Sequence, residues 1–155
     1  DSIVTLEGDG TNDLKALAPM LDKLGEGFDI VCASRYRPGG AYVGFPLKRF
    51  LLSHAANFVA RLVVGIPGIK DYTIFFRGYR ARVIQEALKK FGDGFIESRS
   101  FSANAEILLK AAQCGPLRCG EVPLIYRYDL KRGKTKMKIW RNMLEYFRMY
   151  GRIFT

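Results

Sequence analysis

The chain has 155 residues, of which 48% are hydrophobic and 26% are charged, and its net charge is +10. This balance is typical of one folded globular domain and excludes a disordered segment. No apolar stretch approaches the roughly 20 residues that span a bilayer, and no signal peptide is visible. Three cysteines cannot all pair, and a single histidine, His54, argues against a zinc site, so we expect reduced cysteines in a cytosolic setting.

The charge is unevenly distributed along the chain. Residues 1–33 carry two lysines against seven acids, a net charge of −5, whereas residues 127–155 carry nine basic residues against two acids, a net charge of +7. An acidic start suggests a bound cation, and a basic remainder suggests anionic partners. Nucleic acid, a nucleotide-linked substrate and an anionic membrane surface all satisfy this pattern.

The first 33 residues predict a strand, a helix and a second strand. The β-rich run 2–6 ends in a turn that contains two glycines, and Asn12 or Asp13 can cap the following helix. The second strand covers residues 28–33. Such a βαβ unit predicts parallel strands in an α/β domain. The helix is indicated by apolar residues at helical spacing: Leu14, Leu17, Leu21 and Leu24.

The remaining elements alternate between helices and strands. Pro38 and several glycines predict a loop over 37–45, and Pro46 suits the start of the next helix. Pro123 predicts an edge position or a bulge for the last strand. The apolar stripe of the helix at 46–64 comprises Leu47, Leu51, Ala55, Phe58 and Leu62. The other predicted elements are a strand at 73–79, helices at 81–90 and 103–113, a strand at 117–126 and a helix at 137–152.

Glu7 and Asp9 lie just beyond the carboxyl end of the first predicted strand, where open α/β sheets bind ligands. Alternate carboxylates at such a place can bind one hard divalent cation, which also ligates substrate phosphates. A solvated turn at the end of the strand is the alternative, because such acid pairs also occur by chance.

Two arginines and a hydroxyl form the candidate anion site. Arg35 follows the second strand, and Arg49 and Ser53 are four residues apart, so these two share a helix face with Asn57. Guanidinium groups bind phosphate through paired hydrogen bonds. An ordinary polar helix face is the alternative.

The C-terminal segment is basic and amphipathic. The loop 131–136 can bind phosphates, form a nucleic-acid patch or remain solvated. The helix after Met137 separates an aromatic face from a basic one. Such a helix can lie in a membrane interface or pack on the domain. Glu106 stands in an otherwise apolar helix, so we expect a buried carboxylate with a basic or donor partner, either structural or part of a site. We interpret His54 as a packed or surface residue rather than a general base.

In their order along the chain, these motifs resemble the family 2 glycosyltransferases, and among them the dolichol-phosphate mannose synthase-like branch. The resemblance runs nearly from end to end. It is carried by the segments 4–9 (Val-Thr-Leu-Glu-Gly-Asp), 34–36 (Ser-Arg-Tyr), 71–73 (Asp-Tyr-Thr), 76–80 (Phe-Arg-Gly-Tyr-Arg), 106–111, 121–124 and 133–136 (Gly-Lys-Thr-Lys), together with Arg49, Ser53 and Asn57.

The resemblance implies a GT-A type, Rossmann-like α/β domain that moves a sugar from a nucleotide diphosphate, such as GDP-mannose or UDP-glucose, to a polyprenyl or dolichyl phosphate. It implies inversion at the anomeric carbon and action at the cytoplasmic face of a membrane. By similarity, Glu7 and Asp9 hold Mg²⁺ or Mn²⁺, and Arg35, Arg49 and Ser53 bind the acceptor phosphate. Asp9, Arg35 and Arg49 are the implied catalytic residues. The implied phosphate loop contains Arg127, Arg132, Lys134 and Lys136.

Three positions depart from the family pattern. Glu7 stands where the family has aspartate, and Thr11, next to Asn12, stands where a glutamine is frequent. Leu130 replaces the arginine of the closing loop, so Arg127, Lys131 or Arg132 has to substitute for it.

The family also has strands and helices before the acid pair that bind the nucleotide base, so we expect a fragment that is inactive alone. We assign 1–136 to a partial GT-A domain with its N-terminal part missing, and 137–155 to an amphipathic helix at the membrane interface. The alternatives are a family 2 enzyme with a non-lipid acceptor, a relative that has lost its activity, and a basic module that binds nucleic acid or membrane without catalysis.

Overall fold

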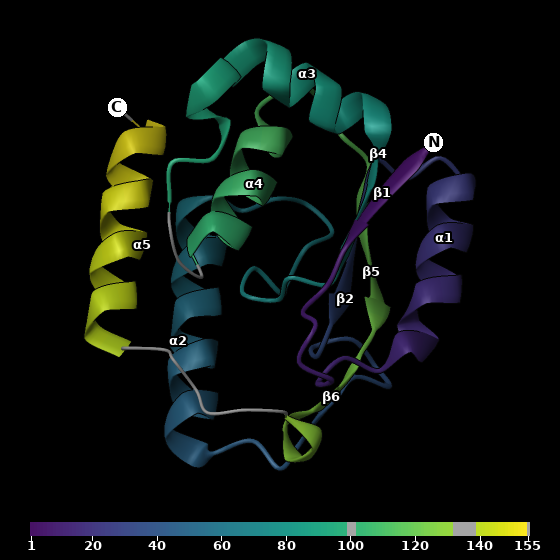
Figure 1. Cartoon of the computed structure of the whole chain (residues 1–155), viewed down its shortest axis with the longest axis vertical. Coiled ribbons are helices and arrows are strands. Elements are labelled where there is room, and N and C mark those ends of the chain that lie inside the picture. The colour runs from purple at the N-terminus through teal and green to yellow at the C-terminus, as the bar shows by residue number, and fades with distance from the viewer. Residues whose placement is uncertain (99–101, 132–138, 155) are drawn as a thin grey trace. The chain divides into compact units, whose positions relative to one another are not determined.

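A computed structural model describes residues 1–98, 102–131 and 139–154. The chain divides into two compact units, one made of residues 1–81 and 117–133 and the other of residues 82–116 and 134–155. The first unit contains all the strands, and the second is helical (Figure 1). The predicted α/β class is confirmed by the mixed sheet of the first unit.

The main sheet of the first unit has four strands in the order β1 (Ser2–Thr5), β4 (Arg77–Arg80), β2 (Ile30–Ser34) and β5 (Cys119–Pro123). β4 runs antiparallel to both β1 and β2, whereas β2 and β5 are parallel. β1 and β2 therefore run in the same direction, as the predicted βαβ unit requires. The expectation of a parallel sheet is wrong in one respect, because an antiparallel strand separates them.

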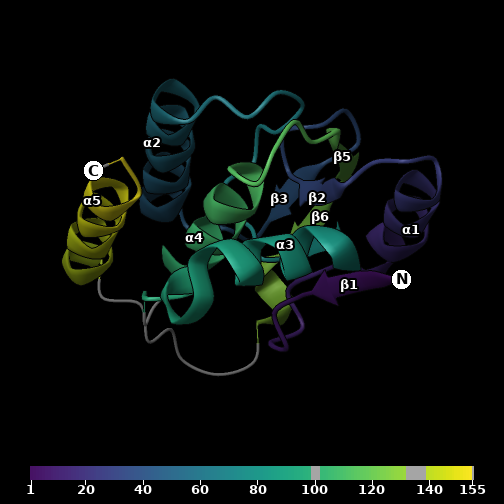
Figure 2. The ribbon, with the colours of Figure 1, turned by 90° about the horizontal axis from the view of Figure 1, so that it is seen from above.

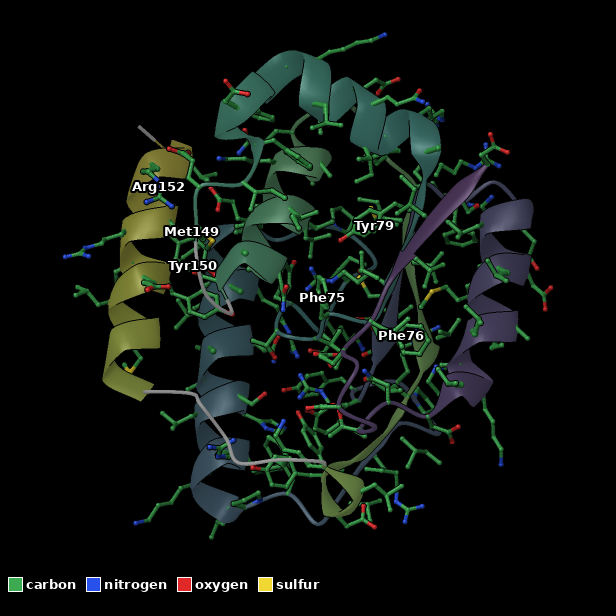
Figure 3. The ribbon with its side chains drawn as sticks, viewed as in Figure 1. Phe75, Phe76, Tyr79, Met149, Tyr150 and Arg152 are labelled. Atoms are coloured by element: carbon green, nitrogen blue, oxygen red, sulfur yellow. The ribbon has the colours of Figure 1, made fainter. Side chains whose placement is uncertain are left out.

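One face of this sheet is covered by α1 (Leu17–Gly25), which follows a 3-10 turn at Leu14–Ala16 whose first amides are capped by Asp13. Met20 and Leu24 on α1 pack with Val31, Ile74 and Phe76 in the core of the unit (Figure 3). Gly78 permits this contact, because a Cβ at that position would lie 2.8 Å from Leu24 Cδ1.

On the other side of the sheet lies α2 (Leu47–Val63) (Figure 2). Its polar side carries the buried residues, Asn57 among them, and its apolar stripe faces solvent: Leu47 and Leu62 are each 71% exposed and Phe58 is 61% exposed. This is the reverse of an ordinary amphipathic helix on a globular core.

Three predicted elements differ from the structure in extent. The expected strand at 73–79 reaches only from Arg77 onward. Before it, the Phe75 carbonyl accepts from the Thr5 hydroxyl at 2.8 Å instead of a neighbouring strand, and Tyr72 N donates to Asn57 Oδ1. The expected loop at 37–45 contains a strand, β3 (Ala41–Val43), paired in parallel with β6 (Ile125–Arg127). The strand predicted over 117–126 is interrupted at Leu124, and its first part, β5, is an edge strand, as Pro123 predicts.

The second unit consists of α3 (Ala81–Phe91, from Arg82 on), a 3-10 turn at Gly92–Phe95, α4 (Ser102–Ala112) and α5 (Ile139–Phe154). Glu106 is fully buried and pairs with Lys110 Nζ at 2.7 Å, which confirms the predicted basic partner. Burial alone would raise the pKa of Glu106, but the hydrogen bonds from Lys110 and Ser98 outweigh it and lower the pKa. On α5, Met149 is buried while Leu144 and Phe147 are exposed (Figure 3).

Candidate functional site

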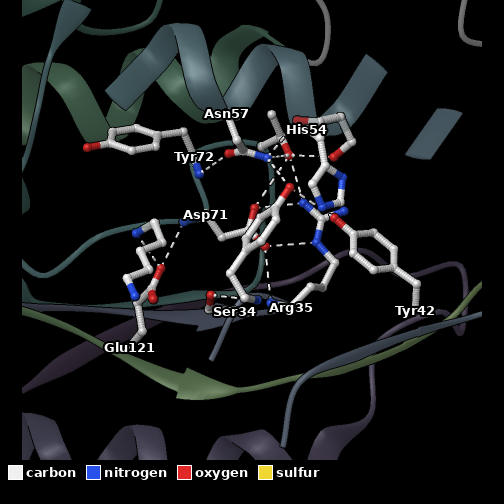
Figure 4. A network of polar contacts seen from close by, with 12 residues as sticks. Ser34, Arg35, Tyr42, His54, Asn57, Asp71, Tyr72 and Glu121 are labelled. Atoms are coloured by element: carbon white, nitrogen blue, oxygen red, sulfur yellow. Dashed lines mark hydrogen bonds and ion pairs between the residues drawn. The ribbon is translucent and has the colours of Figure 1, made fainter. Parts of the chain in front are cut away.

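Arg35 follows the carboxyl end of β2 and is 8% exposed. Its guanidinium forms a paired contact with Asp71, with Nε 2.8 Å from Oδ2 and Nη2 2.6 Å from Oδ1. Nη2 also donates to Thr73 Oγ1 at 2.7 Å. The Arg35 backbone N–H adds a further bond to Asp71 Oδ2 at 3.2 Å, so one carboxylate holds both the main chain and the side chain of Arg35 (Figure 4).

Asn57 connects this pair to α2. Its Nδ2 donates to Thr73 Oγ1 at 3.0 Å, to Tyr36 Oη at 3.0 Å and to the Ser53 carbonyl at 2.9 Å. Ser53 Oγ lies 3.4 Å from Thr73 Oγ1. The structure therefore brings two of the three predicted phosphate ligands, Arg35 and Ser53, to the same hydroxyl group, that of Thr73. Figure 4 shows Arg35 and Asn57 in this network.

Two carboxylates support Arg35, those of Asp71 and Glu121, and their pKa values are shifted in opposite directions. Burial alone would raise the pKa of Asp71, but the Arg35 guanidinium outweighs it and holds that pKa below its usual value. Asp71 and Lys70 donate their backbone N–H groups to Glu121 Oε1, at 2.8 and 2.6 Å. Burial raises the pKa of Glu121, whose Oε2 has no hydrogen-bond partner among the described residues. The Asp71–Arg35 pair is thus the ionic element, and Glu121 supports its backbone.

Aromatic rings enclose the Arg35 guanidinium. Its Cζ lies 4.8 Å from the ring centre of Tyr42 and 5.5 Å from that of Tyr126. His54 is half-buried, stacks on Phe50 with ring centres 4.0 Å apart, and bonds through Nδ1 to the Phe50 carbonyl. A carbonyl oxygen only accepts, so Nδ1 carries the proton. His54 is packed, as the sequence predicts.

Arg49 is held differently from Arg35. It is half-buried in the first turn of α2, with its guanidinium 5.6 Å from the ring centre of Tyr128. No carboxylate pairs with it among the residues that the structure describes. Arg49 therefore presents an uncompensated positive charge, whereas that of Arg35 is balanced by Asp71.

The two predicted metal carboxylates follow β1. Glu7 Oε2 accepts a bond from Asn12 Nδ2 at 2.6 Å, and Asp9 Oδ1 accepts one from Thr11 Oγ1 at 2.5 Å. Lys131 Nζ donates to the other oxygen of Asp9. Burial alone would raise the pKa of Asp9, but the bonds from Lys131 and Thr11 lower it below the usual value.

Tyr126 connects the acidic group to Arg35. Its neighbour Arg127 donates a backbone bond to the Thr11 carbonyl at 2.7 Å, and Asn12 pairs with Tyr126 as an isolated β-bridge. Burial raises the pKa of Tyr126, and the charges of Glu7 and Asp9 add to this effect. Because Arg35 lies over the same ring, one tyrosine interacts with a cationic side chain and with two anionic ones.

Glu7 and Asp9 carry oxygens of the kind that a hard cation accepts, although the described part of the chain holds no cluster of three His, Cys, Asp or Glu side chains. Asn12 is 9% exposed, and its Oδ1 is a buried oxygen without a hydrogen-bond partner among the described residues. With Glu7 and Asp9, it supplies a third oxygen of the type that Mg²⁺ and Mn²⁺ accept, and substrate phosphates usually complete such sites.

Only part of the predicted phosphate loop lies in the described chain. Arg127 pairs with Asp129 at 2.7 Å in a solvent-exposed contact. Arg132, Lys134 and Lys136 lie outside the described residues. Lys131, named above as a substitute for the missing arginine, contacts Asp9.

Sequence reasoning missed the roles of Asp71, Thr73 and Glu121. All three lie in segments that carry the family resemblance, but their partners are 36 to 51 positions away in the chain. Spacing along the sequence shows no such pairing. The signal that was present is chemical, since a buried acid and a buried arginine each require a partner.

Comparison with known proteins adds independent information. No family model matches the chain. It is 30% identical over 135 residues to the polyprenol monophosphomannose synthase of Mycolicibacterium smegmatis, a match that covers 87% of this chain and 48% of that protein. It is 28% identical over 137 residues to the undecaprenyl-phosphate mannosyltransferase of Micrococcus luteus, covering 88% of this chain and 53% of that protein.

The chain thus spans about half the length of the curated relatives that it matches. No helix in the described ranges is both long and apolar enough to span a bilayer. The resemblance indicated by the motifs is confirmed, and over most of its length the chain is a homologue of the polyprenyl-phosphate glycosyltransferases.

Proposed function

We propose that the protein transfers a sugar, mannose in the first instance, from a nucleotide diphosphate sugar to a polyprenyl phosphate. The observation that carries this proposal is the arrangement around Tyr126: the guanidinium of Arg35 lies 5.5 Å from its ring centre, and its β-bridge partner Asn12 donates to the carboxylate of Glu7. Two anions, an acceptor phosphate and a leaving diphosphate, require such neighbouring groups. The names of the two relatives supply the acceptor and the sugar.

The acceptor phosphate is the nucleophile. It is ionised near neutral pH, so its oxygen can attack the anomeric carbon without a general base. The new bond forms between that oxygen and the anomeric carbon as the bond to the diphosphate breaks, and the nucleoside diphosphate leaves with the electron pair. Attack opposite the leaving group inverts the anomeric configuration. Catalysis then rests on positioning and charge stabilisation. It needs no histidine base, in agreement with the packed position of His54.

Each side chain has a role in this proposal. Arg35, Arg49 and Ser53 bind the acceptor phosphate, and Glu7, Asp9 and Asn12 hold Mg²⁺ or Mn²⁺. When bound, the metal neutralises charge on the leaving diphosphate. Arg127 and the loop residues Arg132, Lys134 and Lys136 approach the donor phosphates.

The exposed apolar stripe of α2 supports a membrane location for this reaction. Leu47, Leu51 and Phe58 project from the same helix that carries Arg49 and Ser53. A helix that lies in the lipid interface with this stripe inserted would hold those two side chains near the headgroup level, where a polyprenyl phosphate presents its phosphate. We propose that α2 holds the first unit at the cytoplasmic face of a membrane, and that the amphipathic α5 of the second unit is a separate interfacial helix.

A transfer assay tests the function. The natural protein at full length is incubated with labelled GDP-mannose or UDP-glucose, Mg²⁺ and polyprenyl phosphate, and labelled lipid is expected with one donor. Formation of no labelled lipid from either donor overturns the proposal. Arg49→Ala and Ser53→Ala should raise the KM for the lipid; a family 2 enzyme with a non-lipid acceptor would be insensitive to both changes.

A further inference from the structure

We propose that Asp71 is the positioning residue of the acceptor-phosphate site: it fixes Arg35 by one edge, so that the opposite nitrogen, Nη1, is presented to the phosphate. The inference rests on the proposed function for the identity of the ligand. Its structural basis is the hydrogen-bond network that joins β2, α2 and the segment 70–73 within the first unit (Figure 4).

The donors of Arg35 can be counted. A guanidinium has five N–H groups, one on Nε and two on each terminal nitrogen. Nε donates to Asp71 Oδ2, and the two hydrogens of Nη2 serve Asp71 Oδ1 and Thr73 Oγ1. The two remaining hydrogens are both on Nη1, which has no hydrogen-bond partner in the described part of the chain. The side chain retains 5% exposure, so Nη1 is the part of Arg35 left for a ligand.

Asp71 is itself held in place. It is fully buried, its backbone N–H donates to Glu121 Oε1 at 2.8 Å, and its Oδ2 also accepts the backbone N–H of Arg35 at 3.2 Å. Both oxygens of Asp71 are therefore engaged before any ligand arrives. A donor aligned in advance loses less conformational freedom on binding, which favours affinity.

The Thr73 hydroxyl connects Ser53 to the Asp71–Arg35 network. The Thr73 hydroxyl oxygen accepts from Arg35 Nη2 and from Asn57 Nδ2, at 2.7 and 3.0 Å, which uses both of its lone pairs. Ser53, 3.4 Å away, can then accept from Thr73 but cannot donate to it. The network therefore holds Ser53 at the same hydroxyl group that anchors Arg35.

Arg35 and Arg49 differ in whether a carboxylate balances their charge, and this gives them different roles. The Arg35–Asp71 pair is neutral overall, so Arg35 contributes a directed donor rather than net charge. Arg49 has no carboxylate partner among the described residues and supplies the net positive charge. Screening by salt weakens a net charge more than a short, buried hydrogen bond.

The test measures binding of a short-chain polyprenyl phosphate to the full-length protein, by ³¹P NMR titration, together with the KM values for acceptor and donor. Asp71→Asn should weaken acceptor binding 10- to 100-fold and leave the donor KM within about twofold. Thr73→Val should weaken it by a smaller factor. In an Arg35→Ala background, Asp71→Asn should cause no further loss, because it acts through Arg35. Arg49→Ala should flatten the salt dependence of binding, whereas the uncharged change Thr73→Val should not.

Asp29→Asn is the matched control, since Asp29 is a buried acid of the same unit that accepts the Arg118 backbone N–H at 2.9 Å. It should lower thermal stability without changing acceptor binding. The inference is overturned if Asp71→Asn folds and binds acceptor normally, or if its effect adds to that of Arg35→Ala. If Asp71→Asn does not fold, Thr73→Val decides by the same two criteria. Phosphate binding without sugar transfer would reject the proposed function alone, whereas a wild-type protein that binds no acceptor rejects both.

Discussion

Lys131 Nζ donates a hydrogen bond to Oδ2 of Asp9, the oxygen that the other contacts of this carboxylate leave open. A divalent cation on Asp9 therefore competes with the ammonium group. Both side chains retain partial exposure, 22% for Lys131 and 25% for Asp9, so the competition is modest in energy. We expect Lys131→Met to tighten Mn²⁺ binding by a few-fold, as measured by calorimetry or by the EPR signal of free Mn²⁺.

Lys15→Met provides the control for this change, because it removes an equal charge from an exposed position on the same unit. A long-range charge effect would tighten Mn²⁺ binding equally in both variants. Equal dissociation constants for wild type and Lys131→Met would contradict the competition, and Asp9→Asn should abolish the difference between them.

The apolar stripe of α2 predicts a separable effect on membrane binding. Leu51 and Phe58 are 59% and 61% exposed, so replacing both with glutamine should not lower the melting temperature. Loss of their burial in lipid should cost about 1–2 kcal/mol per side chain, or roughly tenfold each in vesicle affinity. Co-sedimentation with vesicles of neutral and anionic lipid measures this.

Leu21→Gln on α1 is the matched substitution, since Leu21 is 44% exposed on the opposite side of the sheet. It should leave vesicle binding unchanged. A double variant of Leu51 and Phe58 that binds vesicles as tightly as wild type would show that the stripe has another use.

The helices were predictable because their signals are local. The helix predicted at 46–64 is observed at Leu47–Val63, and the one at 81–90 is observed at Ala81–Phe91. Strand pairing depends on distant partners instead. Nothing near Arg77–Arg80 indicates that this strand separates β1 from β2 and reverses the local direction of the sheet.

Candidate site residues were predictable as types but not as a connected group. Arg35 and Ser53 follow from residue chemistry and family resemblance, and the structure joins them through Thr73. The direction in which α2 faces was not accessible from periodicity, which defines an apolar stripe without saying whether protein or lipid covers it. The buried side of α2 is polar because Asn57 satisfies the backbone of Tyr72 there.

Glu121 predicts a pH dependence of stability. Burial raises its pKa above the ordinary value of 4.5. Between pH 4.5 and the folded-state pKa, the folded protein therefore retains a proton that the unfolded chain releases. This contribution to stability is present in full below pH 4.5 and is lost as the pH rises through the folded-state pKa. Glu121→Gln keeps an oxygen for the Lys70 and Asp71 amides and cannot ionise. We expect the variant to gain about 1 kcal/mol over wild type at pH 8 but little at pH 4.

Melting temperatures of both proteins across this range test the prediction. A stability difference that is constant with pH would mean that Glu121 does not titrate between these limits. Acceptor binding should be unchanged, because the backbone of Asp71 keeps its partner.

Gly68 lies in the loop that leads to the Asp71 network, and its φ of +86° is one that L side chains rarely adopt. A Cβ there would lie 2.3 Å from the carbonyl oxygen of Cys119, which belongs to β5 and cannot move freely. Gly68→Ala should therefore destabilise the first unit by more than the roughly 1 kcal/mol expected from backbone conformation alone. Gly27→Ala separates the two effects, because Gly27 has a φ of +98° but only an arginine side-chain atom nearby, at 3.6 Å. Chemical denaturation should give Gly68→Ala a much lower free energy of unfolding than Gly27→Ala. Equal losses of stability in the two variants would show that β5 moves to make room for the added methyl group.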